Sequence, residues 1–257
     1  MKAGLNHLGK PQRRMFYSAR KTAHTWNVFG VCNWSLEFIY ILAGHPGREH
    51  DSTVFKHALS RYGFRVPANS FYLSDSAYAL SQMALKGYSG VRYHVSFFIG
   101  NPPQNRRELF NMYHCSARNY IERLWGVLKK RFPILNDLPT FPLDKQIQII
   151  YACATLHNFI KQTPQNRDEQ EDEYLAEVKQ AEAADLHIAF DNEGQRFAHE
   201  RFHYVADPNE EEELDELEEE DNQDSILWRD RIAAAMWNEY VIRRWERRGG
   251  PQDEEVL

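Results

Sequence analysis

Cysteines, long apolar runs and early acidic residues are all scarce in this chain of 257 residues. The three cysteines, Cys32, Cys115 and Cys153, lie far apart without a Cys-x-x-Cys pair, which argues against a disulfide framework or a structural zinc site. No run of about 18 apolar residues occurs, so the sequence predicts no membrane span. The first 30 residues contain no apolar block, which argues against a secretory signal. We therefore expect a soluble, intracellular protein.

Charge is distributed unevenly along the chain, and no acidic residue precedes Glu37. Residues 1–165 contain 21 Lys and Arg against 8 Asp and Glu, a net charge of +13. Residues 166–257 contain 10 against 29, a net charge of −19. A basic globular part predicts a polyanionic partner such as DNA. The acidic part would either screen that surface or bind a basic partner, unless both parts are simply well solvated.

Hydrophobic patterning predicts strands early in the chain and helices later. Strands are expected at 26–32, 36–42 and 71–75, the first two forming a hairpin that ends at the glycine and proline residues of 44–47. Residues 79–104 look like a loop with a candidate strand at 95–99. Helices are expected at 51–61, 106–132 (with an interruption near Cys115) and 142–160. Helices around a sheet predict a mixed α/β layer fold.

The composition changes after Pro164. Together with the basic start of the chain and the helical pattern near its end, this change divides the chain into four parts. These are a basic segment at 1–24, a core at 25–162, an acidic linker at 163–224 and an amphipathic helix at 225–250. The acidic run at 210–221 predicts disorder by self-repulsion. Large apolar residues recur at helical spacing in the last part, from Trp228 to Tyr240. That face needs a partner surface, either the protein's own core or another chain.

Two carboxylates stand out in the acid-poor part of the chain. Asp75 follows the apolar run at 70–74, and Glu122 lies on a basic amphipathic helix. Phosphodiester chemistry commonly uses two divalent ions about 3.5–4 Å apart, held by a few carboxylates, and such oxygen ligands suit Mg²⁺ or Mn²⁺. Each acid also has an ordinary interpretation. Asp75 would serve as a turn residue, and Glu122 would pair with Arg118 one helical turn earlier.

Four segments, in order, resemble the Harbinger-type transposases and their domesticated nuclease relatives within the DDE superfamily. They are GHPGREHDS at 44–52, LSDSAY at 73–78, RNYIERLWGVLKKRFPIL at 118–135 and LHN at 156–158. The resemblance implies a ribonuclease-H-like mixed sheet with flanking helices, which cuts and joins DNA with a D-D-E triad and Mg²⁺ or Mn²⁺. By position, Asp75 matches the second Asp and Glu122 the Glu.

The resemblance and the residues around the motifs suggest further roles. Arg118 and Lys129 lie on roughly the same helix face as Glu122 and suit DNA phosphates, or they are solvated helix charges. Asp51 falls in the family's separate His-Asp-Ser motif and is expected to cap the following helix. We expect His157 and Asn158 to form hydrogen bonds in the core rather than to bind metal.

The family's first Asp precedes a basic stretch that matches residues 17–21 here, yet nothing acidic precedes that stretch. The first catalytic strand is therefore expected to be missing, as in an N-terminally truncated nuclease, and we expect no appreciable DNA cleavage. The alternatives are a non-catalytic remnant that binds DNA or a partner, and a pure interaction protein. The resemblance also implies a nuclear location and a separate DNA-binding protein partner that selects the target.

Overall fold

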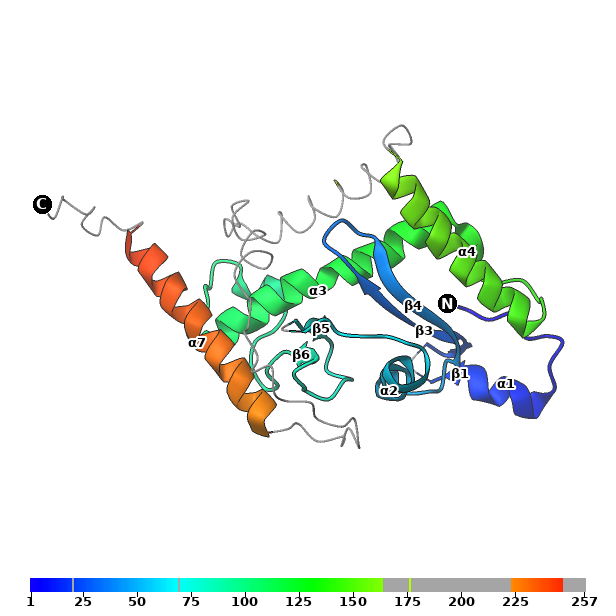
Figure 1. The fold of residues 1–257 in the computed structure, drawn as a ribbon, viewed down its shortest axis with the longest axis horizontal. Coiled ribbons are helices and arrows are strands. Elements are labelled where there is room, and N and C mark those ends of the chain that lie inside the picture. Colours follow the sequence, from blue (N-terminus) through cyan, green and yellow to red (C-terminus); the bar gives the residue numbers. More distant parts are fainter. Residues whose placement is uncertain (20, 69, 164–175, 177–222, 247–257) are drawn as a thin grey trace, which may run out of the picture. The chain divides into compact units, whose positions relative to one another are not determined.

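The computed structural model describes residues 1–19, 21–68, 70–163, 176 and 223–246 (Figure 1). The chain divides into two compact units. The first unit contains the described residues within 1–65 and 118–163 and residue 176, and the second contains those within 66–117 and 223–246. The helix α3 (Arg106–Arg131) contributes residues to both units. The acidic run at 210–221 and most of the expected linker lie outside the described residues.

The first unit is built around an antiparallel hairpin with helices packed on it. The hairpin strands are β3 (Trp26–Cys32) and β4 (Phe38–Pro46), drawn in blue in Figure 1. The other elements are α1 (Lys10–Phe16), β1 (Tyr17–Ser18), β2 (Ala23–His24), α2 (Asp51–Arg61), η2 (Pro133–Leu135) and α4 (Leu143–Gln162). The first strand, the hairpin and the helix at 51–61 are confirmed.

The second hairpin strand begins later and runs further than expected. The prediction that residues 44–47 break it is wrong for residues 44–46, which belong to the strand. Asn27 pairs with His45 and Phe29 with Leu42, so β4 contains one more residue than β3 between these two pairs. Gly44 lies within this bulge at φ +109°, a conformation that glycine adopts at little cost. The strand therefore continues through the bulge, and His45 is buried with 8% of its surface exposed.

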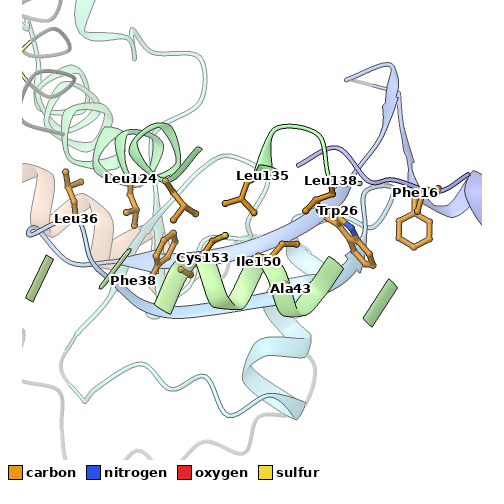
Figure 2. Close-up of a cluster of buried hydrophobic side chains, with 13 residues drawn as sticks. Phe16, Trp26, Leu36, Phe38, Ala43, Leu124, Leu135, Leu138, Ile150 and Cys153 are labelled. Atoms are coloured by element: carbon orange, nitrogen blue, oxygen red, sulfur yellow. The ribbon is translucent and has the colours of Figure 1, made fainter. Parts of the chain in front are cut away.

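The core of the first unit lies between the hairpin and the helices α3 and α4. Leu124 and Leu128 of α3 are fully buried, as the apolar stripe of this helix predicts. Figure 2 shows Phe38, Ile150 and Cys153 among the side chains gathered along α4. Residues of β3 and β4 belong to the same core. Packing against the helices therefore holds the two strands of the hairpin in place.

The second unit contains a small parallel strand pair that the sequence reading missed in part. Its elements are β5 (Tyr72–Ser74), β6 (Ala84–Lys86), the 3₁₀ helix η1 (Val95–Phe98), the first half of α3, and α7 (Gln223–Glu246). The strand expected at 71–75 is found as β5, but the strand expected at 95–99 is wrong. β6 is only three residues long, too short to show an alternating pattern.

The start of α3 shows the capping pattern that an Asn followed three residues later by a Glu, Asn105 and Glu108, favours. Asn105 Oδ1 accepts hydrogen bonds from the backbone N–H groups of Arg107 (3.1 Å) and Glu108 (3.0 Å). Glu108 reaches back to the Gln104 N–H and pairs with Arg92, whose hydrogen bond lowers the pKa of the Glu108 carboxyl. The interruption expected near Cys115 is absent, because α3 continues without a break across that buried residue.

The apolar face of α7 packs on its own unit, which decides between the two alternatives for residues 228–240. Trp228 is 7% exposed in a cluster with Leu80, Leu85 and Phe110, and Met236 packs against it. The hydroxyl of Tyr88 donates to Asp230 Oδ1 at 2.6 Å, joining the helix to the loop after β6. The end of the expected helix, residues 247–250, lies outside the described residues.

The described residues form three two-stranded sheets and several helices, which confirms a mixed α/β fold. Within these residues the strand pairs do not join into one larger sheet. In the part of the chain that the structure describes, no helix has both the length and the apolar character needed to cross a bilayer.

Candidate functional site

Asp75 lies directly after β5, where the parallel pairing with β6 ends at Ser74 and Lys86. Its Oδ1 atom accepts a hydrogen bond from the Ala77 N–H at 2.8 Å, so the carboxylate closes a local turn. This contact is the turn role that the sequence predicts as the ordinary interpretation of Asp75. The role of Asp75 as a metal ligand stays a prediction.

Glu122 lies on α3, and 58% of its side chain is exposed. Arg118, one turn earlier, donates from Nη2 to Glu122 Oε1 at 2.6 Å. The structure therefore brings together the predicted acid and one of the two predicted DNA-binding cations. An exposed ion pair of this kind contributes less than about 1 kcal/mol to stability, so it holds Glu122 only loosely.

The two acids suit a hard divalent cation by donor type, although each already makes a local contact. Both contacts use one carboxylate oxygen, Oδ1 of Asp75 and Oε1 of Glu122, so they are compatible with a metal ion on the other oxygen. Asp75 belongs to the second unit and Glu122 to the first.

Lys129, the second predicted DNA-binding residue, is half-buried near the end of the same helix as Glu122. Burial and the nearby positive charge of Lys21 lower the pKa of its ammonium group. A neighbouring anion would oppose this lowering, because it would interact favourably with the charged form. Lys129 is therefore a half-buried cation whose charged form an anion would stabilise.

Asp51 is not the N-cap of α2, so that prediction is wrong. The helix begins at Asp51, and His50 occupies the N-cap position without a side-chain hydrogen bond to the helix. The Asp51 carboxylate instead accepts a hydrogen bond from Asn27 Nδ2 at 2.7 Å. The amide on β3 thus ties the first turn of α2 to the hairpin, a tertiary contact between distant residues.

His157 and Asn158 form core hydrogen bonds, as predicted. Arg131 donates to His157 Nδ1 (2.6 Å), so the opposite nitrogen, Nε2, carries the proton that is donated to the Leu36 carbonyl (2.8 Å). The Asn158 side chain accepts from the Phe38 N–H (2.9 Å) and donates to the Phe38 carbonyl (2.7 Å). These two residues hold the hairpin on α4.

A cluster of His45, Glu49 and His57 in the first unit was missed by the sequence reading. One ligand atom from each residue lies within 4.8 Å of the other two. The spacing His-x₃-Glu-x₇-His was visible, but the expected break at 44–47 separated His45 from any rigid element. Among the described residues, no other group of three such side chains comes as close together.

Comparisons with known proteins give one match. A family model described as DDE superfamily endonuclease matches residues 6–158. No curated protein and no solved structure matches the chain. The matched region includes Asp51, Asp75, Arg118, Glu122 and Lys129.

Proposed function

Because the chain belongs to the DDE superfamily of endonucleases, we propose that it is a Harbinger-type, transposase-derived nuclease domain that binds DNA and a divalent cation. The observation that carries this proposal is Glu122, an exposed acid on a basic helix within the matched region. We extend the assignment to a ribonuclease-H-like ancestry of the core. A nuclear location and a separate DNA-binding partner belong to the same proposal.

The DNA backbone would lie along the basic face of α3. The guanidinium of Arg118 can leave its ion pair with Glu122 and bind a phosphate instead. The surroundings of Lys129 disfavour its charged form, and a nearby phosphate would stabilise that form. Phosphate contacts of this kind position a duplex without reading its sequence. The proposal therefore predicts binding that depends on salt more than on sequence.

By the family resemblance, Asp75 and Glu122 are each proposed as ligands of Mg²⁺ or Mn²⁺, the type of cofactor that DDE endonucleases generally use. When bound, such an ion stabilises negative charge on a scissile phosphate and lowers the pKa of a coordinated water. The protein's part is to present carboxylate oxygens from a strand end and from a helix, while the cations of α3 keep the backbone in place.

By the family resemblance, the first Asp of the D-D-E set would precede residues 17–21, and no acid precedes Glu37 in these 257 residues. We therefore propose DNA and metal binding without appreciable cleavage for this polypeptide. The second candidate is a remnant that binds DNA or a protein partner without metal. It is favoured by the ordinary local contacts of both acids, the turn at Asp75 and the ion pair at Glu122.

Metal titration distinguishes these two candidates. We expect Mn²⁺ to bind the full chain in a calorimetric titration and Glu122→Ala to weaken that binding by about tenfold or more, since a ligand is lost. The measurement is best made in a His57→Gln background, which removes the separate histidine cluster. Glu239→Ala is the matched control, because Glu239 also forms an ion pair with an arginine one helical turn away. Equal Mn²⁺ affinity in all three proteins would favour the metal-free remnant.

Cleavage is expected to be undetectable. Supercoiled plasmid incubated with the chain and Mg²⁺ or Mn²⁺ should show no nicking above that of Asp75→Ala, because two carboxylates do not complete the triad. Robust cutting by the wild-type chain that disappears in Asp75→Ala would contradict this expectation and would mean that another residue completes the site.

A further inference from the structure

We propose that His45, Glu49 and His57 form a zinc site that joins the end of the hairpin to α2. The cluster shares no residue with the proposed ligands Asp75 and Glu122, and its test involves no DNA. His45 is the second-last residue of β4, Glu49 lies in the following turn, and His57 lies in the second half of α2. All three belong to the first unit.

The donor atoms lie close to the separations of a tetrahedral site, although the contact of His45 with Glu49 is shorter. His45 Nδ1 lies 2.9 Å from Glu49 Oε2, and His57 Nδ1 lies 3.4 Å from Glu49 Oε1. Ligands at about 2.0–2.2 Å from zinc in a tetrahedron lie about 3.3–3.6 Å from one another. The cluster therefore needs only small side-chain rotations to surround an ion, and the two imidazole rings already lie 5.4 Å apart at 31°.

The backbone that carries these ligands is fixed by hydrogen bonds. The Gly47 N–H donates to the Thr25 carbonyl at 2.7 Å, and a Cβ atom at Gly47 would clash with Thr25, so only glycine permits this approach. Asn27 Nδ2 donates to the Glu49 carbonyl at 2.8 Å and to Asp51 at 2.7 Å. The turn is thus held on the hairpin, and Glu49 is positioned before any ion binds.

The donor set selects zinc over the ions proposed for the carboxylate site. Two imidazole nitrogens and one carboxylate suit Zn²⁺, whereas Mg²⁺ prefers oxygen ligands and octahedral geometry. Exposure is limited: the side chains of His45, Glu49 and His57 are 10%, 20% and 27% exposed. A bound ion would also neutralise the partly buried Glu49 charge. It would stabilise the folded unit, because the unfolded chain does not hold the three ligands together.

Zinc titration of the full-length chain tests this site. The tag-free protein, stripped with a chelator, is titrated with Zn²⁺ against a chromophoric chelator. We expect one equivalent to bind, with Mg²⁺ unable to compete. His57→Gln should weaken the binding by at least about 10–100-fold, the loss typical of residues that only support a ligand. His50→Gln is the matched control, because His50 is exposed and lies beside the cluster without belonging to it.

Thermal unfolding gives a second measurement that does not depend on competition. Zinc should raise the Tm of the wild type and of His50→Gln, but not that of His57→Gln. If His57→Gln fails to fold, Glu49→Gln replaces it, since this change keeps the shape and removes the charged ligand. Absence of stoichiometric zinc binding, or equal affinity and equal Tm shifts in wild type and His57→Gln, would overturn the proposal. Glu49 would then serve only as a hydrogen-bond partner of the two histidines.

Discussion

DNA affinity is expected to fall about a thousandfold when salt is raised from about 50 to about 200 mM, if the protein neutralises about six phosphates. The reason is counterion release: each Lys or Arg that contacts a phosphate frees a condensed cation, and this gain shrinks as bulk salt rises. The +13 charge of residues 1–165 supplies enough cations for such a footprint. Fluorescence anisotropy of a labelled duplex over a salt series measures the slope.

Substitutions that each remove one positive charge identify the DNA-binding surface. Arg118→Ala and Lys129→Gln should each weaken binding and reduce the slope of log affinity against log salt by about one. Lys145→Ala removes the same charge from an exposed position on α4 and should leave the slope nearly unchanged. DNA binding that does not depend on ionic strength would instead support the alternative of a pure interaction protein, which acts through its acidic run and its last helix.

Trp228→Ala is expected to lower the free energy of unfolding of the second unit by about 3–5 kcal/mol. The Trp228 ring is 7% exposed and packs edge-to-face on Phe71 with centroids 5.0 Å apart. Truncation would remove most of that buried apolar area and leave a cavity. Urea unfolding followed by far-UV circular dichroism measures the effect.

Trp245→Ala is the matched control, because Trp245 lies on the same helix with 54% of its surface exposed. We expect it to change stability by less than about 0.5 kcal/mol. Equal effects of the two substitutions would contradict the packing of α7 on the second unit. The result also bears on function, since Phe71 directly precedes β5, which ends at the proposed ligand Asp75.

The elements that the sequence predicted well are those whose pattern is local and long. The strand at 26–32 and the helices α2, α3 and α4 each show a continuous apolar pattern. The pairing of β5 with β6 and the 3₁₀ turn η1 were not predicted, because three or four residues give no usable period. The bulge at Gly44 was read as a strand end, since glycine and proline mark both features.

In the candidate site too, features with a local sequence pattern could be predicted and contacts between distant residues could not. The motifs around Asp75 and Glu122 predicted the DDE superfamily, which the family model confirms. The Asn105 cap and the core hydrogen bonds of His157 and Asn158 could be predicted from local preferences. The contact of Asp51 with Asn27 joins residues 24 positions apart, so no local pattern could reveal it.

The sequence alone determined the family, the charge division and the longer helices and strands, because motifs, charge and periodicity are properties of the chain itself. Only the tertiary structure decided that α7 packs on its own unit, that Asp51 bonds to the hairpin, and that His45, Glu49 and His57 converge. The physical reason is that each of these features depends on pairing register and packing between separate elements. Such contacts arise when the whole unit buries its apolar surface, and not from the preferences of any one segment.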